Sequence, residues 1–446
     1  MMPLSNENVG IWFLPDNKNP INGTLKKSEE GEYYLILFNS FDGILDNNLP
    51  DYPVVQGVLS SGEEISLFDV LVIRTKFSLP GFPILECRVS YIYVGALYNS
   101  MKEIKISKAK ISYKYLNYWI NEKSITTIWI KETNEIITNY EMPKLKTFEF
   151  DNMNLKFNFK VKTTGDFYSN YELKQTGFIE FDFKEAAKVD DLLEEMNSFS
   201  DFLTLCYGEL ALKEQVLFYD SNSDEIEFIY DVTQAVKIKE LSEKDMFIKF
   251  SFIAEDFQNC YMNWKQKREL LRPTISYFVE AHERVFHIPM SFLKIVQALE
   301  AFSRRNRCNE SMSKEKFGEL QERLTSCLAA EDDKQLVLGM LSNEPRLRKR
   351  LNDLFSEVNN IFNIPSKKRK SIINKIVNTR NYFTHFDNSL ENKKMEPEEI
   401  IYISKYMKLV LRVILLKELD VSEELIEIRI KESKEFNDCK NNLELC

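Results

Sequence analysis

The chain has 446 residues, of which 44% are apolar and 29% are charged, and its formal net charge is −10. This length exceeds one ordinary hydrophobic core, so two or three domains are expected. The acidic balance excludes a protein that coats nucleic acid non-specifically, and 13 glycines and 13 prolines are too few for long disordered linkers.

Strands are predicted through most of the first half, because short aromatic-rich apolar runs and alternating apolar and polar residues are typical of strands. The predicted strands are 32–39, 91–94, 156–162, 179–184, 216–219, 225–230 and 246–253. A helix is expected over 189–205, where Asp190 and Asp191 lie near its positive end. We therefore expect residues 1–255 to form a β-rich region of one or two sandwich-like lobes, split near residue 145.

The apolar period changes from two to 3.6 after about residue 255, which predicts helices. The expected helices begin near Ser291, cover 313–330 and 346–362, begin again at Ser366, and end with one from Pro397. About five helices with short connections predict a bundle. The fold class is therefore α+β, with a helical domain at 256–430 and a C-terminal tail at 431–446.

Several other classes are not favoured. The N-terminus lacks the basic start and apolar run of a signal peptide, and the run Leu409 to Leu416 is too short to span a bilayer, so no membrane contact is expected. Seven cysteines without a CxxC pair indicate a reducing cytoplasm and no disulfide framework. His282 and His287 are one residue too far apart for two zinc ligands on one helical turn, and no phosphate-binding glycine motif occurs. We expect no metal and no cofactor.

The third histidine lies in a distinctive segment, Arg-Asn-Tyr-Phe-Thr-His at 380–385. On a helix, Asn381 and His385 share a face, and the long side chain of Arg380 can reach the same space. Arg380 also falls where the apolar stripe of its own helix would continue, four residues after Ile376 and three after Val377, so its charge needs an anionic partner. Two partners are open at this point: a carboxylate of a neighbouring helix, or a phosphate of a ligand.

This segment resembles the signature of HEPN ribonucleases, which lies on a late helix of a helical bundle. The run 298–302, Ala-Leu-Glu-Ala-Phe, with Arg304 following, resembles the first helix of ApeA-like HEPN domains. The layout, a β-rich region before this domain, resembles ApeA-type anti-phage defence proteins. The resemblance implies a cytoplasmic homodimer, paired through the helical domain, that cleaves RNA in abortive infection. The β-rich region would then sense a phage-derived trigger or restrain the nuclease.

The residue types suit RNA cleavage without a metal. A ribose 2′-OH attacks the neighbouring phosphorus, and a histidine such as His385 can accept or supply the protons. The guanidinium of Arg380 can stabilise the charge that gathers on the phosphate oxygens. Asn381 can hold a phosphate oxygen or fix the histidine tautomer, and Tyr382 is a supporting candidate. The products would be a 2′,3′-cyclic phosphate and a 5′-OH.

Basic residues gather around the motif, with about 17 basic against about 10 acidic side chains over 301–385. The runs at 304–307, 346–350 and 367–370 are either solvated helix ends or a track for the RNA backbone. The candidates for backbone contact are Arg304, Arg305, Lys367, Lys368 and Arg369. Glu300 either orients the catalytic side chains or forms a surface ion pair with Arg304.

Two other functions remain open. The helical domain can be a non-catalytic HEPN module that binds RNA or nucleotides or serves dimerisation. Alternatively, the chain is a structural subunit in which Arg380 pairs with a core carboxylate.

Overall fold

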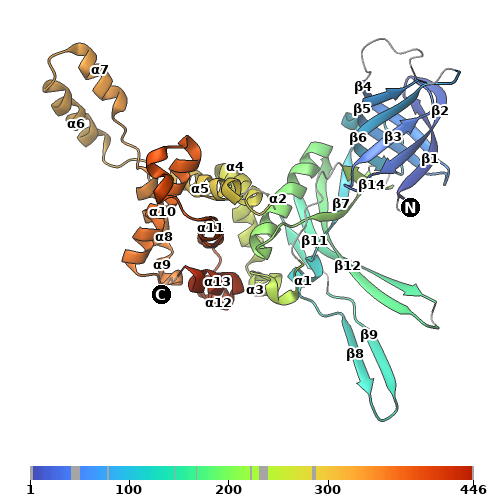
Figure 1. The fold of residues 1–446 in the computed structure, drawn as a ribbon. Coiled ribbons are helices and arrows are strands. Elements are labelled where there is room, and N and C mark those ends of the chain that lie inside the picture. Colours follow the sequence, from blue (N-terminus) through green and yellow to red (C-terminus); the bar gives the residue numbers. More distant parts are fainter. Residues whose placement is uncertain are drawn as a thin grey trace. The chain divides into compact units, whose positions relative to one another are not determined.

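Two compact units make up the chain. The structure, a computed structural model, describes residues 4–41, 51–77, 80–144, 146–166, 168–220, 224–230, 240–283 and 288–443. One unit comprises Met1–Leu203 and Ala211–Glu243, and the other comprises Thr204–Leu210 and Lys244–Cys446. The first is built mainly of strands and the second of helices (Figure 1). This arrangement confirms the α+β class, with a β-rich region before a helical one.

The first six strands close into a barrel. They are β1 Glu7–Leu14, β2 Asn17–Lys27, β3 Tyr33–Leu37, β4 Asp51–Leu59, β5 Glu64–Lys76 and β6 Ile84–Val94. All pairs are antiparallel and run in the order β1–β2–β3–β6–β5–β4, with β4 returning to β1. Trp12, Leu35 and Leu67 are fully buried in its core. A Cβ at Gly57 would overlap the indole of Trp12, so the core requires glycine there.

An open sheet continues from the barrel through β6. Its strands are β7 Ile106–Tyr113, β10 Thr147–Glu149, β11 Met153–Gly165, β12 Tyr171–Ala187, β13 Lys213–Asp220 and β14 Glu225–Tyr230. They follow the order β10-β11-β12-β7-β13-β14-β6. Sandwich-like lobes were expected here, but β6 joins the barrel and the open sheet into one continuous sheet. Alternation along a strand decides which face is buried and leaves strand pairing undetermined.

Two helices accompany the open sheet, α1 Leu116–Ile120 and α2 Val189–Tyr207. Phe199 of α2 packs against rings of the sheet and of α1, namely Tyr113, Trp119 and Phe181. The helix expected over 189–205 is therefore present and two residues longer.

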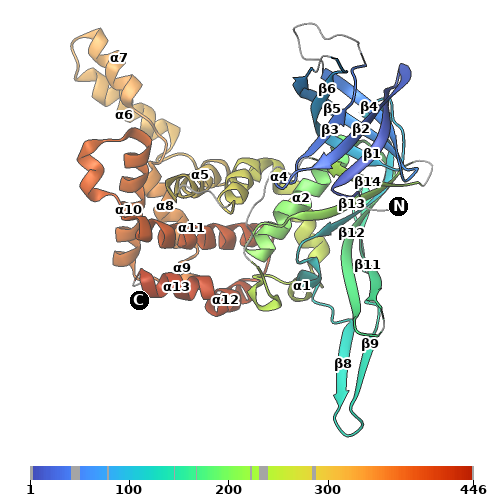
Figure 2. The same cartoon turned by 45° about the vertical axis from the view of Figure 1, so that its right-hand side comes forward.

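Strands β8 Ile125–Ile130 and β9 Glu135–Tyr140 form a separate two-stranded hairpin (Figure 2). Its apolar side chains are unusually exposed, with Trp129 at 61% and its cross-strand neighbour Ile136 at 68%. Ile128 and Ile137, also paired across the strands, are exposed at 61% and 51%. Both faces of the hairpin therefore present large apolar side chains to solvent.

The second unit is a bundle organised around α5. Its helices are α3 Phe250–Ile253, α4 Phe257–Glu280, α5 Ile288–Asn306, α6 Lys314–Ser326, α7 Glu331–Met340, α8 Leu347–Glu357, α9 Asn359–Phe362, α10 Ser366–His385, α11 Pro397–Glu418, α12 Glu423–Glu432 and α13 Lys434–Asn442. Helix α5 packs against α4, α8, α10 and α11. Its apolar stripe, which includes Phe292, Ile295 and Leu299, is fully buried, as its 3.6-residue spacing predicts.

Several details differ from the sequence-based expectations. The segment 346–362 contains two helices, α8 and α9, where one was expected, and the unit has more helices than the five or so predicted. Residues 246–253 do not form a strand: Ile248 donates to the carbonyl of Cys206, and Phe250–Ile253 is the short helix α3. This run is apolar because it is buried in the helical unit, and its length alone does not separate strand from helix.

The helix ends also differ from the expected ones. Ser291 lies inside α5 and donates to the Ala281 carbonyl, so it does not cap that helix. Ser366 is the first residue of α10, after Pro365. The expected tail, 431–446, contains the end of α12 and all of α13, where Phe436 is buried.

Candidate active site

Helix α10 carries the Arg-Asn-Tyr-Phe-Thr-His segment in its last turns. Its buried stripe is made of Ile372, Ile373, Ile376 and Val377, and Arg380 continues this stripe. The α10 stripe packs on α8 and α5. The cation therefore points toward the bundle rather than straight into solvent, as the spacing predicted.

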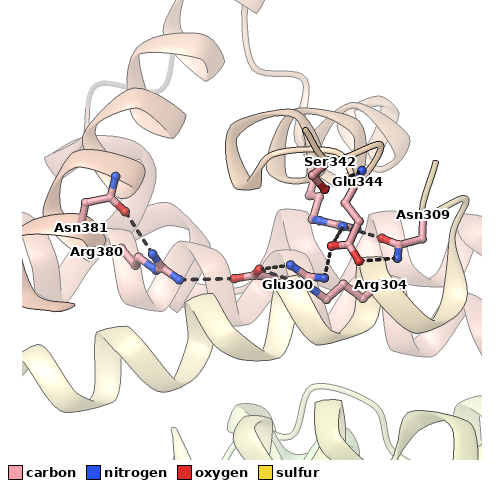
Figure 3. Close-up of polar contacts among 8 residues, drawn as sticks. Glu300, Arg304, Asn309, Ser342, Glu344, Arg380 and Asn381 are labelled. Carbon is pink, nitrogen blue, oxygen red and sulfur yellow. Dashed lines mark hydrogen bonds and ion pairs between the residues drawn. The ribbon is translucent and has the colours of Figure 1, made fainter. Parts of the chain in front are cut away.

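Arg380 is held by one neighbour on its own helix and one on α5 (Figure 3). Its Nη1 donates to Oδ1 of Asn381 over 3.1 Å, and its Nη2 lies 3.8 Å from Oε2 of Glu300. The Arg380 side chain keeps 28% of its surface exposed. Among the described residues, its Nε has no hydrogen-bond partner, so donors remain available for an anion.

Glu300 divides its two oxygens between two arginines. Oε1 accepts from Nε and Nη2 of Arg304 at 3.2 and 3.1 Å, while Oε2 faces Arg380. The Glu300 side chain is 17% exposed, so its charge is partly shielded from solvent. Glu300 thus forms the predicted ion pair with Arg304 and also contacts Arg380.

His385 ends α10 and is exposed. Phe386 follows in the left-handed region at φ 51°, and its N–H returns to the carbonyl of Tyr382, which terminates the helix. Hydrogen bonds from Ser389 hold the pKa of Asp387 below its ordinary value, and the charge of His385 lowers it further. Asp387 is therefore a carboxylate near the imidazole, and the described residues offer that imidazole no hydrogen-bond partner.

Tyr382 lies in an aromatic group at the same end of α10. Its ring meets Phe383 and Phe386 edge to face, with centroids 5.3 and 5.9 Å apart, and the Lys394 ammonium lies 4.8 Å from its centroid. Phe386 is 70% exposed. These contacts position the Tyr382 ring. No hydrogen bond between the described residues joins Tyr382 to Arg380.

The candidate RNA-backbone residues fall into two groups. Arg304 pairs with Glu300 and Glu344, and Arg305 donates to the carbonyls of Leu270 and Glu269. In contrast, Lys367 is exposed in the first turn of α10. Lys368 and Arg369 follow it and are half-buried. The α5 cations thus bond to groups of the helical unit, and the three α10 cations gather in the first turn of their helix.

Sequence reasoning missed a second polar group behind Glu300 (Figure 3). Glu344 bonds Arg304 and Asn309 and lies 3.4 Å from Nη2 of the buried Arg350. Desolvation, then the charge of Arg304, lowers the pKa of Arg350 below its ordinary value. No sequence signal marks this group, because Glu344 lies in a loop 44 residues after Glu300.

His282, one of the two histidines considered as metal ligands, makes other contacts in the described structure. His282 is buried, its Nδ1 donates to the Phe278 carbonyl over 2.8 Å, and its Nε2 lies 3.3 Å from Nη2 of Arg412. His287 lies outside the described residues. Over the described ranges, no group of three potential ligand side chains gathers that could hold a metal ion.

Two family models match the chain. Residues 7–264 match "ApeA N-terminal domain 1", and residues 293–425 match "Apea-like HEPN". The chain belongs to the ApeA-like HEPN proteins. No curated protein and no solved structure matches it significantly.

The HEPN match contains every residue of the candidate site. It begins within α5, before Glu300, and extends beyond α11, so it includes the whole of α10. The resemblance inferred from the Arg-Asn-Tyr-Phe-Thr-His segment is thereby confirmed. No helix among the described residues has the length and apolarity needed to cross a bilayer.

Proposed function

We propose that this HEPN protein is a metal-independent endoribonuclease of an anti-phage system that acts by abortive infection. Arg380 and His385 are the catalytic residues, and Asn381 supports them. The observation that carries the proposal is the partly exposed guanidinium of Arg380, which lies on the helix that ends at His385 and contacts Asn381 and Glu300. A fixed cation that retains open donors is pre-organised for a phosphate.

Each side chain has a separate task in this mechanism. His385 accepts the proton of the 2′-OH or supplies one to the departing 5′-oxygen. Arg380 binds the equatorial phosphate oxygens as charge develops on them. Asn381 accepts from Nη1 and leaves the Nε side of the guanidinium open. The products are a 2′,3′-cyclic phosphate and a 5′-OH.

The geometry of α10 supports a site shared by two copies. His385 follows Arg380 by five residues, which is about 140° around a helix of 3.6 residues per turn. The two Cβ atoms of one copy therefore lie on different sides of the helix, and no hydrogen bond between described residues joins the two side chains. Two motifs lining one cleft of a homodimer, paired through the helical domain, would bring an arginine and a histidine to the same phosphate.

The rival structural role has one observation on its side, namely the contact between Arg380 and Glu300. This contact is long, at 3.8 Å, and Arg380 keeps 28% of its surface exposed. A purely structural pair is expected to be closely bonded and buried, because removing one partner of a buried pair is strongly destabilising. The measured contact fits a positioned cation better than a core ion pair.

Cleavage of total RNA in EDTA tests the proposal. Wild type is compared with Arg380→Ala, His385→Ala and the control Lys375→Ala, which removes an exposed cation of α10 paired with Glu399. We expect losses of at least about a hundredfold for the two motif variants and little change for the control. New 5′-OH ends, detected by direct kinase labelling, identify the chemistry.

The sensing role of the β-rich unit is tested in the same assay. Extract from phage-infected cells is expected to raise cleavage by the full chain, and extract from uninfected cells is not. Equal cleavage by wild type and His385→Ala, or none with infected extract, would refute the nuclease. RNA gel shifts that survive in both motif variants, without cleavage, would identify a binding module instead.

A further inference from the structure

A groove of about 500 Å³ lies between α8 and α10. Four basic side chains line it: Arg346, Arg348 and Lys349 from the start of α8, and Lys370 from α10. Asp353 is the one carboxylate in the lining, and it pairs with Lys349 at 3.0 Å. The α8–α10 groove is therefore strongly positive.

The other three groove cations are not neutralised. Within the described part of the chain, no carboxylate lies at ion-pair distance from Arg346, Arg348 or Lys370, and all three are exposed. Two neighbouring cations differ, because Arg304 of α5 and Arg307, which directly follows α5, pair with glutamates. Unpaired charges of one sign at close range repel each other, and a bound anion relieves that repulsion.

The helix ends add to this positive field. The first turns of α8 and α10 contain no acidic residue, although the helix dipole favours acidic side chains there. Basic residues occupy both first turns, at 348–349 and 367–370. Basic residues thus occupy the first turns of two helices that pack together, where acidic residues are favoured. This arrangement points to a ligand that supplies the missing negative charge.

The groove also connects to the candidate active site along one face of α10. Six polar residues at spacings of three or four share that face. They are Lys367, Lys370, Asn374, Asn378, Asn381 and His385. All six are exposed or half-buried, and Lys370 and Asn374 line the groove. From Lys370 to His385 this stripe runs about 22 Å, at 1.5 Å per residue.

We propose that the α8–α10 groove binds the phosphate backbone of the single-stranded RNA segment that flanks the scissile phosphate. This proposal rests on the proposed function, because it supplies the substrate path to that site. The lining amides of Asn352 and Asn374 can bond ribose or base edges. Ile373 is the one apolar side chain of the lining, and it is buried, so an acidic protein segment would find little apolar surface to bury.

The test measures RNA binding without cleavage. A 2′-O-methyl RNA oligonucleotide, which lacks the attacking hydroxyl, is titrated by fluorescence anisotropy at several salt concentrations. Arg348→Ala with Lys370→Ala is compared with wild type and with Lys316→Ala plus Arg323→Ala, which removes the same charges from exposed positions of α6. Thermal unfolding checks that all proteins are folded.

The groove variant is expected to raise Kd about tenfold or more near 0.1 M salt. It should also reduce the slope of log K against log salt by about 1.4, for two lost phosphate contacts on a single strand. In the α6 control, Kd should stay within about twofold of wild type and the salt slope should be nearly unchanged, because the two lost charges are screened from the bound RNA.

The outcomes separate this proposal from the nuclease itself. A groove variant that binds RNA like wild type, while cleavage still depends on His385, overturns the groove and leaves the proposed function intact. A groove variant that loses binding, while no chain cleaves RNA, supports the groove and refutes the nuclease. Labelled RNA can also be competed with unlabelled RNA or with an oligoglutamate peptide. If the peptide displaces it as effectively as the unlabelled RNA, the assignment to nucleic acid is overturned.

Discussion

Glu300 on α5 and Arg380 on α10 meet through Oε2 and Nη2, 3.8 Å apart, while Arg304 holds the other oxygen of Glu300. Because Arg304 fixes the carboxylate, Glu300 sets a defined position for the guanidinium of Arg380. The long contact leaves Arg380 able to bind a phosphate without first breaking a strong bond. Glu300 is thus a positioning residue in the proposed mechanism.

Glu300→Gln tests this positioning role. Glutamine keeps the shape of the side chain and removes its charge, so the guanidinium loses its fixed direction. We expect kcat for RNA cleavage to fall about tenfold while KM changes little, because the interaction matters most in the transition state. Steady-state kinetics on a short RNA would measure both constants.

Glu344→Gln is the matched control. Glu344 is the second glutamate that pairs with Arg304, and the variant likewise replaces a carboxylate by an amide. No described contact joins Glu344 to Arg380. Its kcat should stay close to that of wild type. Equal losses of kcat in the two variants, or a loss that follows a lowered melting temperature, would refute a specific positioning role for Glu300.

Mixing two inactive variants tests the shared site. Arg380→Ala and His385→Ala are each expected to be inactive, and subunit exchange should form dimers that carry one intact arginine and histidine pair. Activity should return to about a quarter of wild type, because about half of the dimers are mixed and each holds one pair. No recovery, although mixed dimers are demonstrated by mass spectrometry, would place each site within one subunit.

The helical half was more predictable than the β-rich half. The apolar stripes of α5, α8 and α10 follow the 3.6-residue period, and each is buried as that period requires. The barrel was not predictable, because alternation in 156–162 or 179–184 defines a wet and a dry face without naming the partner strands. Closure depends on β6 pairing with β3 and on β4 pairing with β1, and neither pair is consecutive in the sequence.

The candidate site was predictable only along one helix. The spacing from Ile376 and Val377 to Arg380 predicted a cation at the end of a buried apolar stripe, and Arg380 lies at that position in α10. The partner of that cation depends on how α5 packs against α10, which local spacing does not encode. Glu300 was weighed because of its place beside Arg304, whereas Glu344 and Asn309 lie in connections without periodicity and gave no signal.

His282 predicts how stability depends on pH. Its Nε2 faces an N–H donor of Arg412, so the neutral ring with Nδ1–H fits and a second N–H does not. Burial, then the charges of Lys408 and Arg412, hold the pKa of His282 well below 6.5. Below about pH 6.5 the unfolded chain therefore binds a proton that the folded chain does not.

The free energy of unfolding should consequently fall by about 1.4 kcal/mol per pH unit below about pH 6.5 from this residue, and it should not change with His282 above about pH 7.5. Denaturant unfolding of wild type and His282→Gln from pH 5 to 8 measures this effect. Glutamine does not titrate, so the difference between the two proteins should vary below pH 6.5 and be flat above it. A constant difference over the whole range would contradict a neutral His282.

Substitutions in the β8–β9 hairpin are expected to change the stability of the protein very little. Trp129 and Ile136 face each other across its strands and are exposed at 61% and 68%. Trp129→Thr with Ile136→Thr places a β-branched side chain, which suits a strand, at both positions and removes only solvent-exposed apolar surface. The free energy of unfolding, measured by thermal unfolding, should therefore change by no more than about 0.5 kcal/mol. Trp119→Ala, at a fully buried indole, should cost about 3–5 kcal/mol in the same thermal unfolding experiment. A large loss from the hairpin pair, especially one that grows with protein concentration, would mean that a second copy covers this surface.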